Sequence, residues 1–511
     1  MSLESVTTSI DDAVSDFFEP VATNVGEVVF YTVPVGDTDL PLIVAWLVVA
    51  GLVFSTWFGL IQVRKFKLAI DVVRGKYDED GSPGEVNHFQ ALTAAVSGTV
   101  GLGNIAGVAV AVSIGGPGAT FWMILCGLLG MATKFVEVTL GVKYRQEHED
   151  GTVSGGPMHY LPKGLAERFG SVGAKFGKVL AVLASIMILF FGLFGGNLFQ
   201  TNQSYAQVTS SFGGEDGFMG SSAGAILFGL VVAALVGLVL LGGIRSIASV
   251  TSKLVPAMAG MYIVACLVVI LSNVTAVPDA FQLIIQRAFD GQGVVGGVIG
   301  ALIVGFQRAA FSNEAGLGSA PIAHSAVKTK HPASEGLVAL LEPFIDTVVI
   351  CTMTALTIII ADPDSWAEAR EGNTDIGGVT ITSDAFETVI PWFPDLLTVA
   401  VLLFAFSTIL TWGYYGLKAW TYLFGKSQTS EIVFKAIWSL FVIAGSLLSL
   451  DTLISLADSA LFTLAVFNII GLYLLAPVVK RELNSFLDFV RRRKAGLPDA
   501  EAELQTEKSL D

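Results

Sequence analysis

Charged residues are scarce in this 511-residue chain, at 14% of the sequence, whereas apolar residues make up 53% and the mean hydropathy is +0.69. Soluble domains carry about 25% charged residues, so this deficit excludes a soluble globular protein. Alternating segments of about ten residues, which are typical of a membrane β-barrel, are absent as well. The sequence therefore predicts an all-α polytopic membrane protein, in which each helix satisfies its own backbone hydrogen bonds.

Cysteine and histidine are rare, with three and five residues. All three cysteines lie inside apolar segments, which predicts packing and no disulfide or metal framework. Only His324 approaches an apolar segment, so the paired intramembrane histidines of a haem-binding electron-transfer subunit are missing. The chain also lacks a GxxxxGK[ST] phosphate-binding loop. We therefore expect no enzyme and no cofactor, and any transport must draw on an ion gradient. The cysteines are Cys126, Cys266 and Cys351.

Long apolar segments are abundant. A hydrocarbon core of about 30 Å requires roughly 20 mostly apolar residues per helix. Eleven segments meet this length, near residues 41–62, 89–113, 118–143, 177–207, 222–242, 252–272, 293–323, 336–361, 395–421, 431–450 and 453–478. Eleven crossings place the two ends of the chain on opposite sides of the membrane.

Lysine and arginine are unevenly distributed. If the N-terminus lies outside, 25 of the 29 basic residues fall in cytoplasmic loops or in the tail 479–511, as the positive-inside rule requires. The basic tail fits a contact with anionic membrane lipid. Residues 1–40 contain eight acids and no basic residue, which predicts an acidic extracellular segment. The net charge of −15 favours a prokaryotic cell-membrane protein from a saline environment, without a nucleic-acid partner.

The segments divide into a peripheral helix, 41–62, and two halves, 89–272 and 293–478. Each half holds five segments, and because five is odd, the halves insert in opposite senses. In both halves the first segment is interrupted by glycines and small polar residues. We therefore predict two inverted five-helix repeats with broken first helices, an architecture whose substrate site lies near the membrane midplane.

The first break, SGTVGLGNIAG at 97–107, places three glycines beside polar residues. Glycine lets the backbone leave the helical conformation without steric cost. The freed carbonyls can bind a cation, and the amides at the start of the following half-helix can bind a carboxylate. Close helix packing is the alternative role for such glycines, although Ser97, Thr99 and Asn104 within eight residues favour a binding site.

The second break, FQRAAFSNEAGLGS at 306–319, holds charged residues that are costly inside a membrane. We expect Arg308 and Glu314 to share a network that pins the unwound segment, and Phe311 to serve as a lid or as packing. Lys134 and Glu137 are expected to form a snorkelling pair near an inner helix end. Glu342 and Asp346 lie four residues apart on one helix face, where they could bind a cation or a proton or form a structural polar network.

Several motifs in this chain resemble those of the alanine or glycine:cation symporter family, also called sodium:alanine symporters. The match runs from about residue 41 to 478. The resemblance implies a leucine-transporter-like fold and sodium-coupled uptake of small amino acids. The motifs are GTVGLGNIAG at 98–107, GGPG at 115–118, GGPMHYL at 155–161, FQRAAFSNEAGLGSAPIAH at 306–324 and LEPFIDT at 341–347.

The resemblance also implies a set of site residues. The first break presents backbone and amide groups to the amino acid, two further side chains add polar contacts, and two aromatic residues wall the pocket: Gly101, Gly103, Asn104, Gln200, Asn313, Phe311 and Trp412. Sodium lies between two carbonyls and two hydroxyls: Ser97, Val100, Ser407 and Thr408. The hydroxyls alone can also bond back to the preceding helical turn.

The function we predict is sodium-coupled symport of small neutral amino acids by a monomer. L-Alanine and glycine are the expected substrates, with D-alanine and serine as further candidates, because aromatic walls leave little room beyond a methyl group. A proton-coupled transporter of a similar solute remains the alternative, with Glu314, Glu342 or Asp346 changing protonation. A channel or a sensor is the third class, although the short tail provides no output domain.

Overall fold

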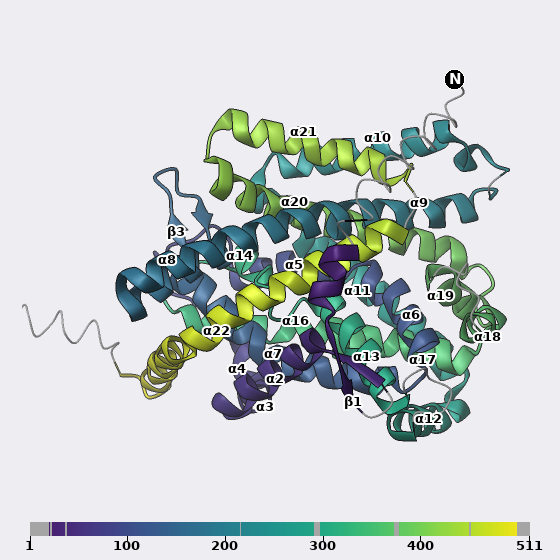
Figure 1. Ribbon diagram of the computed structural model, residues 1–511, viewed down its shortest axis with the longest axis horizontal. Helices are drawn as coiled ribbons and strands as arrows, with labels where there is room; N and C mark the ends of the chain where they lie inside the picture. The colour runs from purple at the N-terminus through teal and green to yellow at the C-terminus, as the bar shows by residue number, and fades with distance from the viewer. Residues whose placement is uncertain are drawn as a thin grey trace, which may run out of the picture.

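The computed structural model describes residues 20, 23–35, 38–214, 216–290, 297–371, 378–448 and 451–497, and of residues 451–456 the backbone alone. Within these residues the chain is a bundle of helices that run across the molecule (Figure 1). The main helices are α2 (Leu42–Trp57), α5 (His88–Thr99), α6 (Ala106–Ile114), α7 (Ala119–Lys143), α8 (Pro157–Leu193), α9 (Phe199–Ser211), α10 (Ser222–Leu240), α11 (Gly243–Ser272), α13 (Gly297–Asn313), α15 (Pro332–Ala339), α17 (Thr352–Ala361), α20 (Phe393–Phe424), α21 (Gln428–Gly445) and α22 (Asp451–Lys494).

Shorter elements connect these helices. The short helices are α3 (Ile61–Arg64), α4 (Phe66–Val73), α12 (Val277–Asp290), α14 (Ala320–His324), α16 (Leu341–Pro343), α18 (Asp364–Arg370) and α19 (Gly378–Glu387). Two small antiparallel pairs complete the described part, β1 (Thr32–Val35) with β2 (Thr38–Pro41) and β3 (Gln146–Glu147) with β4 (Val153–Ser154).

The all-α membrane class is confirmed. Among the described residues, seven helices are long and apolar enough to cross a membrane, and the bent pair α5 and α6 makes an eighth. Both predicted breaks are present, one between α5 and α6 and one between α13 and α14. The count of eleven crossings and the bounds of the repeats stay predictions. Of the predicted segments, residues 1–19, 21–22, 36–37, 293–296, 449–450 and 498–511 lie outside the described residues.

The bounds of two predicted segments differ from the helices. The segment 41–62 contains a helix that ends at Trp57, because Gly59 and Leu60 adopt left-handed backbone angles (φ 64° and 53°). Helix α8 begins at Pro157, twenty residues before the predicted segment. Its chain reverses at Gly170 (φ 62°), and a methyl group on Gly173 would lie only 2.0 Å from the Leu165 carbonyl oxygen. The part of α8 before Gly170 therefore packs tightly against the part after it as a helical hairpin, which its polar composition did not indicate.

The predicted cytoplasmic segments meet on one face. Glu85 in the loop after α4 accepts a hydrogen bond from the Val153 amide and pairs with Arg245 at the start of α11. Asp78 in the same loop accepts hydrogen bonds at its carbonyl from Arg493, at the end of α22. These contacts join segments far apart in sequence, and Figure 1 shows β3 and the start of α8 at one end of the molecule. The shared face fits the predicted distribution of basic loops.

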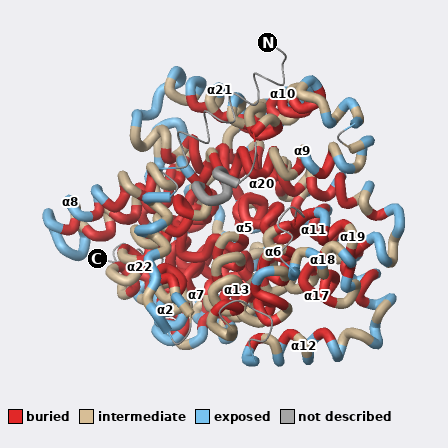
Figure 2. Tube along the Cα trace, turned by 45° about the vertical axis from the view of Figure 1, so that its right-hand side comes forward, coloured by how far each residue is buried: buried red, intermediate tan, exposed pale blue. Residues whose placement is uncertain are grey.

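The opposite end of the bundle carries α12, α18 and α19 (Figure 1). Trp366 on α18 donates a hydrogen bond to the Val112 carbonyl of α6 at 3.3 Å. Thr382 on α19 donates to the Ile105 carbonyl at 3.2 Å. The connection between the predicted segments 336–361 and 395–421 therefore covers the half-helix that follows the first break. Between the two ends, α5, α13 and α20 lie in the buried interior (Figure 2).

Candidate substrate and cation site between two broken helices

The first break is a sharp turn of the backbone. Helix α5 ends at Thr99, and the helical segments on either side of the break meet at an angle of 61°. The Asn104 side chain closes the turn by accepting a hydrogen bond from the Gly101 amide at 2.9 Å. A methyl group on Gly101 would lie 2.6 Å from the Thr408 hydroxyl oxygen. Glycine is needed here because the backbone touches α20.

A small buried pocket opens beside this turn. Five of the predicted substrate residues line it, together with residues that the sequence did not indicate. The lining consists of Gly98, Thr99, Gly101, Gly103, Phe191, Gly195, Gln200, Phe311, Glu314, Thr408 and Trp412. The Phe191 ring packs between Trp412 and Phe311, with centroid distances of 4.5 and 5.9 Å. Aromatic rings therefore close the pocket on the side of α8 and α20.

Two predicted substrate residues face away from this pocket. The Asn104 amide donates a hydrogen bond to the Asp346 carboxylate at 2.7 Å. The Asn313 amide donates to the Thr347 hydroxyl at 3.0 Å, and its carbonyl oxygen accepts from the Ala315 amide. Both side chains bind neighbouring residues of the protein, so they hold the two breaks in place.

Three of the four predicted sodium residues converge between α5 and α20. The Ser97 carbonyl oxygen accepts a hydrogen bond from the Thr408 hydroxyl at 3.2 Å. The Ser407 hydroxyl lies 3.4 Å from the same carbonyl, but its shorter hydrogen bond goes back to the Phe404 carbonyl of the preceding turn at 2.9 Å. The Ser97 hydroxyl donates in turn to the Ser407 carbonyl at 2.8 Å. Val100, the fourth predicted sodium residue, directly follows the end of α5 at Thr99 and is the last residue before the turn. Thr411 joins the group through the Ser97 hydroxyl at 3.0 Å.

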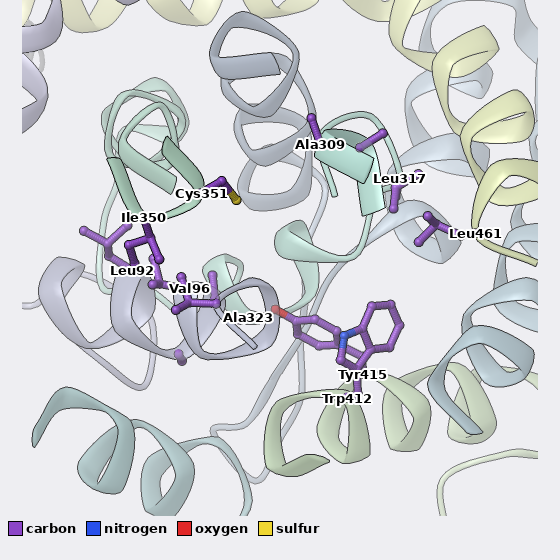
Figure 3. Packing of buried hydrophobic residues seen from close by; sticks show 14 of the residues in the cluster. Leu92, Val96, Ala309, Leu317, Ala323, Ile350, Cys351, Trp412, Tyr415 and Leu461 are labelled. Atoms are coloured by element: carbon purple, nitrogen blue, oxygen red, sulfur yellow. The ribbon is translucent and has the colours of Figure 1, made fainter. Parts of the chain in front are cut away.

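The second break is held by side chains from three directions. Glu314 adopts a left-handed backbone angle (φ 56°), which costs energy for a residue with a side chain. Its carboxylate accepts hydrogen bonds from Ser319 at 2.5 Å and from Trp412 at 3.1 Å. Glu137 on α7 accepts from the Gly318 amide at 3.0 Å. Figure 3 shows Trp412 and Tyr415 extending from α20 towards this buried region.

The predicted network of Arg308 with Glu314 is wrong, whereas the predicted pair of Lys134 with Glu137 is present but does not lie near the membrane surface. Arg308 pairs with Asp458 of α22 at 2.7 Å, while Glu314 binds other partners. The guanidinium lies one turn before the break and points outwards to a neighbouring helix. Lys134 does not snorkel, because its side chain is fully buried. Its ammonium lies 3.3 Å from Glu342 and 3.7 Å from Glu137.

Several functional neighbours have weak sequence signals. Phe191 and Gly195 line the pocket from the end of α8 and a following π-helical turn, Phe194–Leu198. The only sequence signal near these two residues is the Gly195–Gly196 pair inside an apolar segment. Asp346 lies on a second π-helical turn, Phe344–Cys351, and accepts hydrogen bonds from Ser312 and Thr347 at 2.8 and 2.7 Å. This buried carboxylate links the two breaks, which no sequence spacing could reveal.

A helical membrane bundle with two broken helices around a closed pocket defines a secondary transporter of leucine-transporter-like fold. The crystal structure of MhsT in complex with L-phenylalanine shares this fold, with a TM-score of 0.51 at 15% identity over 80% of this chain and 99% of that one. The chain belongs to the sodium:alanine symporter family, whose sequence model matches residues 29–502. It is therefore a transporter and not an enzyme.

Named relatives have similar levels of identity. The sodium/alanine symporter AgcS of Methanococcus maripaludis is 37% identical over 460 residues, which cover 89% of this chain and 96% of the relative. The probable sodium/glutamine symporter GlnT of Bacillus subtilis is 33% identical over 457 residues, 89% of each chain. The amino-acid carrier protein AlsT of the same organism is 35% identical over 454 residues, 88% of this chain and 90% of the relative.

Proposed function

We propose that this protein is a sodium-coupled symporter of L-alanine and glycine that works by alternating access, with D-alanine and serine as weaker substrates. The observation that carries the proposal is the small pocket between the first break and the aromatic side chains of α8 and α20. Family membership supplies sodium and an alanine-type amino acid as the expected ligands. The pocket supplies the argument for the size of the substrate.

Identity to relatives leaves the substrate open, since one relative is named for alanine and another for glutamine. The aromatic wall favours the smaller side chain. Phe191 and Trp412 are in edge contact at 4.5 Å, and Phe311 covers Gly103, whose added methyl group would lie 3.4 Å from that ring. Each extra methylene changes binding by about 1–3 kcal/mol. We therefore expect graded discrimination among small amino acids and exclusion of long side chains.

The amino acid lies against the first break in this proposal. Its carboxylate meets the backbone amides of Leu102 and Gly103 at the start of the second half-helix, where the helix dipole favours negative charge. Gln200, whose side-chain oxygen lies 3.5 Å from the Leu102 amide, completes the polar side of the pocket. Asn104 and Asn313 act as positioning residues, because their amides are bound to Asp346 and Thr347.

Sodium binds beside the substrate, between α5 and α20. The carbonyl oxygens of Ser97 and Val100 and the hydroxyls of Ser407 and Thr408 provide neutral oxygen ligands. In the present arrangement the Thr408 hydroxyl donates to the Ser97 carbonyl, and the Ser407 hydroxyl donates to the Phe404 carbonyl. Sodium replaces these hydrogen bonds and locks the first break against α20, which prepares the pocket for the amino acid. Each ligand thereby favours the state that the other stabilises.

The membrane arrangement follows the charge distribution. We propose a monomer in the cell membrane of a prokaryote from a saline environment, with the N-terminus outside and the C-terminus in the cytoplasm. The contacts among Glu85, Val153 and Arg245 support a common cytoplasmic face for these loops. Labelling of single cysteines placed at Asp150 and at Asp364 in intact cells would test this orientation, since the two positions lie on predicted opposite sides.

Uptake of labelled alanine into proteoliposomes tests the proposed function. An inward sodium gradient is compared with potassium and with an inward proton gradient, and unlabelled glycine and glutamine serve as competitors. We expect accumulation with sodium, strong competition by glycine and weak competition by glutamine. Accumulation driven by protons alone would contradict sodium coupling, and stronger competition by glutamine than by glycine would contradict the assignment of the pocket.

A further inference from the structure

A group of seven buried ionisable side chains lies beneath the second break, outside the proposed substrate and sodium ligands. We call it the charged cluster. Its members come from α5, α7, α14, α15, α16 and the break itself, and all are at most 3% exposed: His88, Lys134, Glu137, Glu314, His324, Glu335 and Glu342. Such a concentration of ionisable groups inside a membrane protein is costly and therefore marks function.

Histidine 324 sits between two carboxylates at the centre of the cluster. Its Nδ1 lies 2.5 Å from Glu335, and its Nε2 contacts Glu342. A neutral imidazole donates only one hydrogen bond, whereas both ionised carboxylates only accept. The three side chains can therefore satisfy both contacts only when they share one additional proton. That proton is held either on the imidazole, which then donates on both sides, or on one carboxyl group.

The charge balance of the whole cluster requires further protons. Its four carboxyl groups face a single lysine, Lys134, which contacts Glu342 and Glu137. With both histidines neutral and every carboxyl group ionised, the cluster would hold three uncompensated negative charges in the membrane interior. Burial of unpaired charges costs several kcal/mol for each ion. The cluster therefore retains protons, and their number depends on the other charges nearby.

A chain of contacts connects His324 with the predicted cytoplasmic face. Glu335 uses its second oxygen to contact the Nδ1 atom of His88. The Nε2 atom of His88 lies 3.6 Å from Asp78, whose side chain is 51% exposed. A proton that enters at Asp78 can pass to His88, while His88 gives its Nδ1 proton to Glu335 and Glu335 gives a proton to His324. One proton enters from solution, one proton arrives at His324, and each intermediate group keeps its number of protons, with His88 left as its other tautomer until its ring proton returns to Nδ1.

The other end of the cluster touches the transport pocket. Glu137 holds the Gly318 amide of the second break, and Glu314 binds Ser319 and lines the pocket with Thr408 and Gly101. Lys134 interacts electrostatically with Glu314 as well as with Glu342. Thr408, a proposed sodium ligand, lines the same small pocket as Glu314, so a cation bound at Thr408 changes the electrostatic potential at the cluster.

Groups on neighbouring elements complete the surroundings of His324. Helix α14 packs against α5, α7, α15 and α20. Besides the members of the charged cluster, these elements carry further ionisable groups, of which Figure 3 shows Tyr415 in the same buried region: Cys126 and Lys143 on α7, and Asp395, Tyr414, Tyr415, Lys418 and Tyr422 on α20. Arg145 approaches from the loop after α7 and donates hydrogen bonds to the Ser325 and Val327 carbonyls. Its positive charge favours the loss of a proton from His324, and the two carboxylates oppose that loss.

We propose that the charged cluster is a proton-binding site, centred on His324 with Glu335 and Glu342, that exchanges protons with the cytoplasm through His88 and releases a proton when sodium binds beside the pocket, between α5 and α20. The added positive charge lowers the affinity of the cluster for its shared proton, and linkage requires that protons weaken sodium binding in return. The inference rests on the proposed function because sodium is the cation proposed to bind there.

Proton release can be measured directly on the purified, full-length protein. Sodium chloride and alanine are added in weakly buffered solution with a pH-indicator dye, and potassium chloride with alanine serves as the reference. Sodium-dependent alanine binding is measured in parallel with radiolabelled alanine. We expect the wild-type protein to release up to about one proton for each sodium-dependent binding event. Sodium-dependent alanine binding without proton release between about pH 6 and about pH 8 would overturn the inference and leave the proposed function intact.

Substitutions assign the released proton to the cluster. His324→Gln and Glu335→Gln should abolish most of the release, whereas His148→Gln should preserve it, because His148 lies on the same face but bonds to Ser154 outside the cluster. Unchanged release in both cluster variants would overturn the assignment. If a variant does not fold, the wild-type measurement and the other variant still decide. Absence of sodium-dependent alanine binding in the wild type would overturn the proposed function, and the inference with it.

Discussion

Substitution of Gly101 by alanine tests the contact between the first break and α20. The new methyl group would lie 2.6 Å from the Thr408 hydroxyl oxygen and 3.4 Å from the Gln200 side-chain oxygen. An ordinary contact of about 3.4 Å with Thr408 requires a displacement of about 0.8 Å, the difference between these two distances. Thr408 cannot retreat freely, since its hydroxyl also bonds to the Ser97 carbonyl at 3.2 Å. The break must therefore move away from the proposed sodium ligands.

The energy of this overpacking sets the size of the effect. Extra methyl groups in a well-packed interior cost about 1–3 kcal/mol, which corresponds to a loss of affinity of about 5- to 150-fold. We expect the sodium concentration for half-maximal alanine binding to rise by a factor in this range. Gly107→Ala is the matched control, because a methyl group at Gly107 would have no neighbour within 4 Å.

The assay is equilibrium binding of radiolabelled alanine to purified protein over a series of sodium concentrations. Size-exclusion chromatography and thermal melting show whether each variant is folded. A folded Gly101→Ala variant with the sodium dependence of the wild type would refute the reasoning, because it would mean that neither ligand depends on this contact. An equal loss in Gly107→Ala would show that the first break is sensitive to any added methyl group.

Three further predictions concern single contacts. Thr408→Ala should raise the sodium concentration required for uptake about 10- to 150-fold, because it removes a ligand worth about 1.5–3 kcal/mol. Thr421→Ala on the same helix should leave the sodium requirement unchanged. Equal effects of the two substitutions would contradict the sodium assignment. Trp412→Leu should let glutamine compete for alanine uptake, and an unchanged size preference would place the wall elsewhere. Arg308→Leu should lower the free energy of unfolding by about 1–3 kcal/mol, because it leaves Asp458 unpaired. Adding Asp458→Asn should recover part of the lost melting temperature. No recovery would argue against the ion pair.

The sequence predicts the membrane class and the two breaks because both leave local marks. Long apolar segments indicate helices, and clusters of glycine with polar residues indicate where those helices are interrupted. The hydroxyls of Ser407 and Thr408 could also be assigned to the first break, because family resemblance supplied the distant pairing with Ser97. In each case the signal lies within a few residues or in a motif.

The polar contacts between helices could not be predicted in the same way. Arg308 and Glu314 are six residues apart, yet they face different neighbours, because the backbone leaves the helix between them. Lys134 looked like a residue that reaches the membrane surface, but its depth depends on Glu342, more than 200 positions away in the chain. Partners across helices are determined by packing, which spacing along one helix does not contain.

The two breaks are stabilised by different physical means, and this difference bears on coupling. The first break is bound to α20 by hydrogen bonds between neutral hydroxyls and carbonyls, each worth about 0.5–1.5 kcal/mol. The second break is bound by the carboxylates of Glu137 and Glu314, and hydrogen bonds to charged groups are roughly twice as strong. In the function we propose, sodium needs neutral oxygen ligands that are freed from weak hydrogen bonds, and it can therefore reorganise the first break at low cost. The second break would respond instead to charge, so that the proposed sodium beside the pocket and the proposed proton in the charged cluster would both act on this segment.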